Sequence, residues 1–101
     1  MEYAPMLTDK QKKLLKGLAH HRKPIVMMGS NGLTQAVLAA LEEALQKHEL
    51  VKVKIAAGDR DERDRVIGDM IKATRTELVQ RVGNMATVFR RNPQNPVVQL
   101  K

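Results

Sequence analysis

The chain has 101 residues, of which 43% are hydrophobic and 29% are charged, and its formal net charge is +7. This size and composition suit one small globular domain and exclude a multidomain architecture. The sequence has no cysteine, which excludes disulfides and thiolate metal sites. It has no apolar run near the roughly 20 residues that cross a membrane and no signal-peptide pattern. We therefore expect a cytoplasmic protein that is not inserted in a membrane.

The positive charge predicts a polyanionic partner, with nucleic acid as the first candidate and an anionic membrane surface as the second. Lys and Arg exceed Asp and Glu before residue 35 and after residue 77, whereas the middle of the chain is nearly balanced. The aromatic residues are only Tyr3 and Phe89. Successive bases therefore cannot stack on aromatic side chains, and we expect contacts with phosphates and with RNA shape instead.

The first predicted helix begins after Thr8 and ends before Pro24. Thr8 and Gln11 have the spacing of a capping box. Leucines repeat on one face of this helix, and basic side chains gather on the opposite face. These basic residues are Lys12, Lys13, Lys16, His20 and Lys23. No acidic residue interrupts the cluster, so it is either an ordinary solvated surface or a surface that binds a polyanion.

A glycine loop follows a short strand, which we predict over the apolar residues 25–28. The loop consists of Gly29, Ser30, Asn31 and Gly32. A helix capped by Thr34 and ending near His48 comes next. Glycine lets another backbone approach closely, and the first N–H groups of a helix carry partial positive charge. The loop is thus either a simple turn or a phosphate-binding site.

Residues 50–56 alternate between apolar and polar side chains, which predicts a strand with one buried face. Lys52 and Lys54 lie on its other face, where they either bind a partner or protect a sheet edge. A third helix begins near Asp59, and its charges alternate in sign, as is typical of a solvated helix.

Two further strands are predicted over residues 77–82 and 86–91, with a hairpin at Gly83 and Asn84 between them. The last strand ends in Arg90 and Arg91, whose side chains should point to opposite faces. At most one of these two arginines can share a surface with the strand lysines.

These elements predict an α/β fold in a single domain covering residues 1–101, with loose ends at about 1–6 and 92–101. We expect a mixed four-stranded sheet in which each of the two strand–helix–strand crossovers makes a parallel pair and the final hairpin is antiparallel. The second and third helices should pack on one face, whereas the position of the first helix stays open.

A catalytic site is not predicted. His20, His21 and His48 lack metal-ligand spacing, and Ser30 does not lie in a G-x-S-x-G motif. A P-loop needs Lys-Ser or Lys-Thr after the second glycine, where this chain has Leu33. We expect no enzyme activity, no cofactor, no metal and no small-molecule substrate.

As a set of segments, the chain resembles the CRM family (chloroplast RNA splicing and ribosome maturation), in particular its stand-alone bacterial YhbY branch. The matching segments are residues 7–16, 24–34, 48–54, 78–83 and 88–91. The resemblance implies a fold similar to the C-terminal domain of bacterial initiation factor three, and it implies RNA binding. Plant members assist intron splicing, and the lone bacterial form associates with precursors of the large ribosomal subunit. One departure is the loop centre, where family members often carry a basic residue and this chain has Ser30 and Asn31.

The resulting hypothesis is a monomeric RNA-binding factor that acts on precursor 50S particles through the glycine loop and a basic surface. The residues assigned to RNA binding are Gly29, Ser30, Asn31, Gly32, Lys12, Lys13, Lys16, Lys23, Lys52, Lys54, Arg90 and Arg91. We expect Gly32→Asp to abolish RNA binding and to leave the fold intact. The alternatives are a protein-interaction module on the ribosome and a general basic binder of RNA or DNA.

Overall fold

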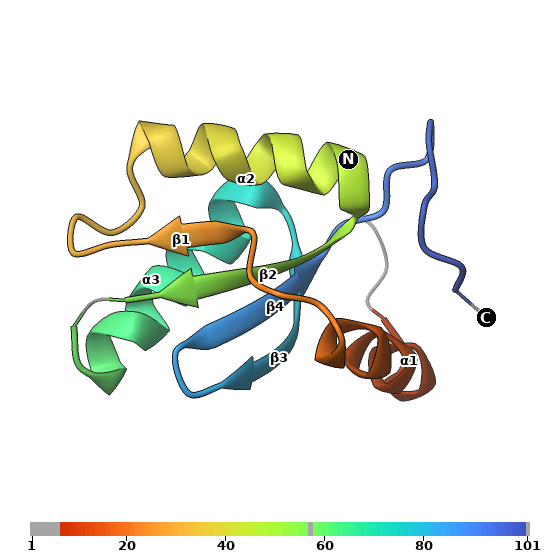
Figure 1. Ribbon diagram of the computed structural model, residues 1–101, viewed down its shortest axis with the longest axis horizontal. Helices are drawn as coiled ribbons and strands as arrows, with labels where there is room; N and C mark the ends of the chain where they lie inside the picture. Colours follow the sequence, from red (N-terminus) through yellow and green to blue (C-terminus); the bar gives the residue numbers. More distant parts are fainter. Residues whose placement is uncertain (1–6, 57, 101) are drawn as a thin grey trace.

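The computed structural model describes residues 7–56 and 58–100, and its helices and strands follow one another in the predicted order (Figure 1). The elements are α1 (Asp9–His20), β1 (Val26–Met28), α2 (Gln35–His48), β2 (Leu50–Ile55), α3 (Arg60–Thr74), β3 (Glu77–Val82) and β4 (Met85–Phe89). The predicted α/β class and element order are therefore confirmed. None of the helices in these described ranges is long and apolar enough to cross a membrane.

Side-chain caps set the helix starts, as the sequence predicts. At α1 the Thr8 hydroxyl accepts the Gln11 N–H at 3.0 Å, and the Gln11 side chain accepts the Thr8 N–H at 3.0 Å. Asp59 and Glu62 form the same reciprocal capping box at α3. Each cap satisfies N–H groups that have no partner within the helix, and so it fixes the first turn.

The sheet has the strand order β1-β2-β4-β3. β1 and β2 are parallel, as predicted for the first crossover, and β3 and β4 form the predicted antiparallel hairpin. The prediction for the second crossover is wrong, because β4 lies between β2 and β3 and pairs antiparallel with both. Burial explains the arrangement: β4 is buried along most of its length and takes the central place, whereas β3 is largely half-exposed and takes the edge.

Helices cover both faces of the sheet, because alternate side chains of β2 and β4 point to opposite sides (Figure 1). The larger core lies between the sheet and helices α2 and α3. Its buried members are Val26, Met28, Leu41, Ala44, Leu45, Val51, Val53, Ile55, Ile67, Met70, Ala86 and Val88. The smaller core lies under α1 on the other face, with Leu15, Ala19, Leu50, Val79, Phe89 and Val98. The position of α1, which the sequence left open, is therefore the face opposite α2 and α3.

The C-terminal segment differs from its prediction as a loose end. Val98 is buried in the smaller core, and Leu100 packs against that core. The last strand also ends earlier than predicted, at Phe89, so Arg90 and Arg91 lie beyond it. Burial of one apolar side chain and a set of hydrogen bonds described below hold this segment in place. The predicted loose residues 1–6 and residue 101 lie outside the described residues.

Candidate nucleic-acid interface

The glycine loop connects the end of β1 to the start of α2 and forms a tight turn. The Gly32 N–H donates to the Gly29 carbonyl at 3.0 Å, and the Thr34 N–H donates to the Gly32 carbonyl at 3.1 Å. Gly32 has a φ of +71°, a conformation that costs an ordinary side chain about 1 kcal/mol or more. Any side chain at position 32 is therefore strained, so Gly32→Asp should lower stability as well as RNA binding, and that it leaves the fold intact stays a prediction.

Gly29 differs from Gly32, because nothing within the protein requires a glycine there. Its φ is not positive, and a Cβ built on it meets no atom within 4 Å. Gly29, Ser30 and Asn31 are all exposed. The missing side chain at Gly29 therefore leaves open space on the outside of the molecule, where the backbone of a partner can come close.

The N-terminus of α2 points out of the same loop. The Thr34 hydroxyl accepts the Val37 N–H at 3.2 Å. The N–H groups of Gln35 and Ala36 belong to the first turn, which has no partners within the helix. The first turn of α2 contains no acidic residue, so no side chain in that turn neutralises its partial positive charge.

The neighbouring helix α3 begins at the same end of the sheet, after β2, but the side chains around its N-terminus are negatively charged. Asp61 and Glu62 lie in its first turn, and Asp59 caps it. These three carboxylates would repel a phosphate, so α2 is the helix whose N-terminus suits an anion. A small cavity of about 50 Å³ separates the glycine loop from α3, with Gly58, Glu62 and Val66 on the α3 side.

The predicted lysines of α1 divide into two kinds. Lys13 and Lys16 are exposed on the outer face of the helix, and Lys23 is exposed just beyond its end. Lys12 is half-buried and lies 3.8 Å from the Glu77 carboxylate of β3. An acidic partner on a distant strand leaves no signal in the sequence of the helix, so this pair was not predicted.

Lys52 and Lys54 lie on the face of the sheet that α1 occupies, since Leu50 on the same side of β2 is in the core under α1. The Lys52 ammonium donates to the Arg22 carbonyl at 3.0 Å, and the Arg22 guanidinium donates to the Leu50 carbonyl at 2.8 Å. These reciprocal bonds fix the end of α1 on the sheet. The strand lysines and the helix lysines therefore lie on the same side of the molecule.

Arg22 was missed as a site residue, although the basic run 20–23 offered a signal for it. Together with its neighbours it lines a groove of about 380 Å³ between the end of α1 and the sheet. The lining residues are Arg22, Lys23, Ile25, His48, Leu50 and Lys52. The groove is basic, since no carboxylate of the described residues lines it.

Arg90 and Arg91, which were predicted as RNA contacts, lie in internal ion pairs. Arg90 donates to both carboxylate oxygens of Glu42, at 2.9 and 3.1 Å, and to the Thr74 carbonyl at 2.8 Å. Arg91 donates to Glu49 and to the Val98 carbonyl. The two side chains point to opposite sides of the sheet, as predicted, and each holds other elements together.

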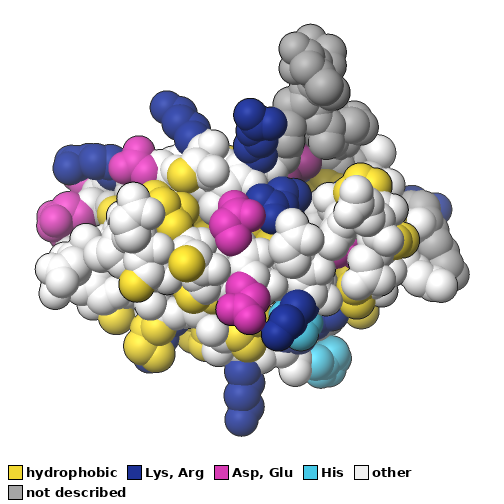
Figure 2. Space-filling view, turned by 90° about the horizontal axis from the view of Figure 1, so that it is seen from above, with side chains coloured by type: hydrophobic (Ala, Val, Ile, Leu, Met, Phe, Trp, Pro, Cys, Tyr) yellow, Lys and Arg dark blue, Asp and Glu magenta, His cyan; other side chains and the backbone are white. Residues whose placement is uncertain are grey.

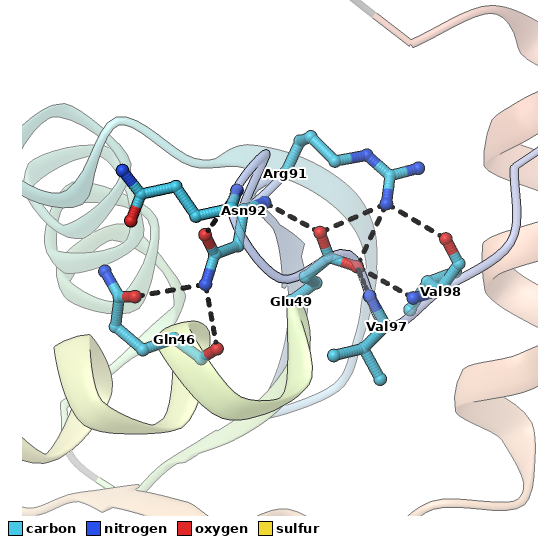
Figure 3. Close-up of polar contacts among 7 residues, drawn as sticks. Gln46, Glu49, Arg91, Asn92, Val97 and Val98 are labelled. Carbon is cyan, nitrogen blue, oxygen red and sulfur yellow. Dashed lines mark hydrogen bonds and ion pairs between the residues drawn. The ribbon is translucent and has the colours of Figure 1, made fainter.

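Glu49 is the centre of the network around Arg91 (Figure 3). Its carboxylate is fully buried and accepts the N–H groups of Asn92, Val97 and Val98, each at 2.7 Å. Burial raises the pKa of Glu49, but these N–H donors and the charge of Arg91 outweigh it and hold the pKa below its ordinary value of 4.5. The network ties the segment after β4 to the end of α2.

The face that carries α2 does not extend the basic surface. Figure 2 shows acidic and basic side chains interspersed on that face. Glu43 and Lys47 form an ion pair at 3.5 Å along α2. The basic surface therefore lies on the side of α1.

No group of three or more His, Asp or Glu side chains in the described part of the chain is placed to hold a metal ion.

The fold and this site define a class of protein: a small α/β domain that presents an exposed glycine loop, a free helix N-terminus and a lysine-bearing sheet face. The CRS1/YhbY (CRM) domain matches residues 7–90 of the chain. The chain therefore belongs to the CRM domain family, and the resemblance stated from the sequence is confirmed.

Relatives in several bacteria are similar over most of their length. A probable RNA-binding protein of Pseudomonas aeruginosa is 48% identical over 88 residues, which are 87% of this chain and 85% of the relative. An RNA-binding protein of Haemophilus influenzae is 48% identical over 84 residues, covering 83% and 85% of the two chains. The probable RNA-binding protein YqeI of Bacillus subtilis is 33% identical over 95 residues, covering 94% and 99%.

The fold is also that of a solved relative. The solution structure of a Staphylococcus aureus protein, described there as a candidate RNA-binding protein, matches with a TM-score of 0.81 and 33% identity. The match covers 95% of this chain and 100% of that chain. These three relatives and the solved structure are all named for RNA binding.

Proposed function

We propose that this chain is a cytoplasmic, monomeric RNA-binding factor that assists assembly of the large (50S) ribosomal subunit by binding its precursor RNA. The names of the relatives support RNA as the partner. The family resemblance supports the precursor of the large ribosomal subunit as the source of that RNA. The observation that carries the proposal is Gly29. Its absent side chain serves no contact inside the protein, so a partner that needs the space explains it best.

In the proposed complex, a phosphate of the RNA lies against the glycine loop. Gly29 lets the RNA backbone approach, and the N–H groups of Gln35 and Ala36 face the phosphate together with the partial charge of α2. Ser30 and Asn31 supply a hydroxyl and an amide for hydrogen bonds. The loop then binds through backbone groups and dipoles, which compensates for the missing basic residue at its centre.

The basic surface adds the electrostatic part of the affinity. Lys13, Lys16 and Lys23 are exposed, and Lys52 and Lys54 lie on the same side of the molecule. Lys12, Arg90 and Arg91 are engaged in ion pairs with carboxylates, so we assign them to shaping the surface and not to direct phosphate contacts. Each phosphate contact releases counterions, so the affinity falls steeply as salt rises.

The experiment that tests this proposal is a binding titration with purified RNA. Fluorescence anisotropy would compare the wild-type chain and Gly29→Asp on fragments of the large-subunit precursor RNA and on small-subunit RNA of equal length. We expect preferential binding to the large-subunit fragments. In Gly29→Asp the affinity should fall at least tenfold, about 1.4 kcal/mol, because the new carboxylate repels the phosphate.

The matched control is Ala73→Asp, which adds the same charge at an exposed position near the far end of α3. It should keep nearly the wild-type affinity. Its melting temperature should fall slightly, because Asp is a weaker helix former than Ala and lies at the negative end of α3, whereas Gly29→Asp should keep the wild-type value. Equal loss in the two variants would reduce the effect to net charge. Full RNA affinity in Gly29→Asp would contradict the proposal, and binding to the precursor particle without binding to its naked RNA would favour a protein-interaction module.

A further inference from the structure

A large part of the sheet face on the side of α1 is open. The core under α1 includes Leu50, Val79 and Phe89, which lie toward one end of their strands. Beyond them the strand register sets side chains in rows across the sheet: Met27 beside Lys54, Lys54 beside Met85, and Met85 beside Val82. In the next row Lys52 lies beside Thr87 and Thr87 beside Gln80.

Large apolar side chains are exposed on this open part of the sheet face. Met27 is 63% exposed, Val82 is 61% exposed and Ile25 is 54% exposed. Ile25 and Met27 lie at β1 and Val82 ends β3, and the strand pairing brings all three to one face of the sheet. Single exposed apolar residues are common, but three on one sheet face, two of them in a row that also holds Lys54 and Met85, indicate a binding surface.

Cations lie among these apolar side chains. Lys52 lines both the groove of about 380 Å³ beside α1 and a second groove of about 190 Å³ toward β3 and β4. The second groove is lined by His20, Lys52, Gln80, Val82, Met85 and Thr87. No carboxylate from the described residues lines either groove, so the face combines apolar contact area with uncompensated positive charge.

This combination matches the chemistry of unpaired nucleotides. A paired duplex presents its phosphates and sugars outward and keeps the faces of its bases stacked inside, so it offers nothing to the exposed methionine and valine. An unpaired strand offers both phosphates for the lysines and flat base faces for apolar side chains. The half-buried side chain of Gln80 adds an amide that can hydrogen-bond base edges.

We propose that the open sheet face, centred on Met27, Lys52, Lys54 and Val82, binds an unpaired segment of RNA. The inference rests on the proposed function and deepens it, because it specifies the form of the RNA. β1 leads from this face directly into the glycine loop, and α1 stands at the other end of the face (Figure 1). The loop holds a phosphate, and the sheet face holds the bases of a neighbouring unpaired stretch.

The test uses two RNA probes of equal length: a fully paired hairpin, and the same hairpin with an internal unpaired segment. The variant is the double substitution Met27→Ser and Val82→Ser, which leaves every charge in place. Its affinity for the partly unpaired probe should fall about tenfold, the scale of removing one to two buried apolar side chains from the interface. Its affinity for the paired hairpin and the salt dependence of binding should stay at the wild-type values.

Two controls keep the result decisive. Val97→Ser removes another exposed valine, outside the two rows, and should change neither affinity. Gly29→Asp should weaken both probes, because it acts on the phosphate contact. One contrary outcome is that the double variant binds both probes as the wild type does while Gly29→Asp loses affinity for both. In that case the sheet-face inference is wrong and the proposed RNA-binding function stands.

Two other outcomes also overturn the inference. An equal loss on both probes would show that the apolar residues contact any RNA or that the fold has changed, which a melting curve would separate. Wild-type RNA affinity combined with lost association with the precursor particle would assign the face to a protein partner. If the wild-type chain binds neither probe nor precursor RNA, the proposed function itself fails.

Discussion

The two ends of the sheet use their polar groups in opposite ways. At the end where β1 leads into α2, the loop exposes Gly29, Ser30 and Asn31, and the α2 N-terminus carries no acidic residue. At the other end, where α2 leads into β2, the buried carboxylate of Glu49 binds Arg91 and three backbone N–H groups (Figure 3).

The difference shows that charge in a sequence is not the same as charge available to a partner. Arg90 and Arg91 are adjacent and look like a binding pair, yet both are satisfied within the protein. The glycine loop has no charged side chain at all, yet its polar groups face outward. We therefore expect changes at the Glu49 end to alter stability and changes at the loop end to alter binding.

The largest effect should come from Glu49→Ala. It leaves Arg91 without its carboxylate and three backbone N–H groups without their acceptor, so the free energy of unfolding should fall by about 3 kcal/mol. Urea denaturation measures this directly. Glu43→Ala, which removes an exposed partner of Lys47, should change stability by less than about 0.5 kcal/mol. If the two variants unfold at similar urea concentrations, the buried Glu49 network does not stabilise the fold more than an exposed ion pair does.

Acid should weaken the Glu49 end first. The pKa of Glu49 is lower in the folded chain than its ordinary value of 4.5, so the unfolded chain binds more protons near that pH. The stabilisation is fully present above about pH 4.5 and is lost as the pH falls through the lower, folded-state pKa. Melting temperatures measured from pH 7 to pH 3 should show a drop in the wild type. Glu49→Gln, already less stable, should show a shallower drop, and parallel curves would count against the assignment.

A binding contrast of intermediate size concerns lysines. Lys13→Gln with Lys16→Gln should lower RNA affinity about tenfold at low salt and reduce the salt slope by about 1 for each phosphate that is no longer bound. Lys47→Gln with Lys72→Gln removes the same charge from α2 and α3, which lie on the other side of the sheet. The second pair should leave the salt slope unchanged, as measured by anisotropy at several salt concentrations. Equal salt slopes for the two double variants would mean that the lysines of α1 bind RNA no more than those of α2 and α3 do.

The smallest and sharpest contrast lies between the two loop glycines. Gly32→Ala should lower the free energy of unfolding by about 1 kcal/mol, because its φ is +71°. Gly29→Ala should leave stability unchanged or raise it by a few tenths of a kcal/mol, because its conformation suits alanine and the unfolded chain loses freedom. RNA affinity should nevertheless fall in Gly29→Ala. Equal stability loss in both would mean that the fold requires both glycines.

Much of the fold was predictable because its signals are local. Helix caps at Thr8, Thr34 and Asp59 mark helix starts within a few residues, and the alternation along β2 marks its buried face. Strand order is a different matter. The insertion of β4 between β2 and β3 depends on which strand has more surface to bury, and that is decided only when all four strands meet.

The site was predictable in part for the same reason. The glycine loop is contiguous in the sequence, so its residues could be named together. The network of Glu49 joins residues more than 40 positions apart, and nothing near Glu49 in the sequence indicates a buried carboxylate. The pair between Lys12 and Glu77 and the anchoring of residues 92–98 were missed because they too depend on long-range packing.

The most direct test of the central claim is ultraviolet crosslinking in growing cells, followed by sequencing of the attached RNA, for the wild-type chain, Gly29→Asp and Ala73→Asp. The account predicts a sharp peak on precursor large-subunit ribosomal RNA that persists in Ala73→Asp and disappears in Gly29→Asp, with equal protein levels. An undiminished peak in Gly29→Asp, or a diffuse spread of crosslinks over many RNAs in the wild type, would contradict it.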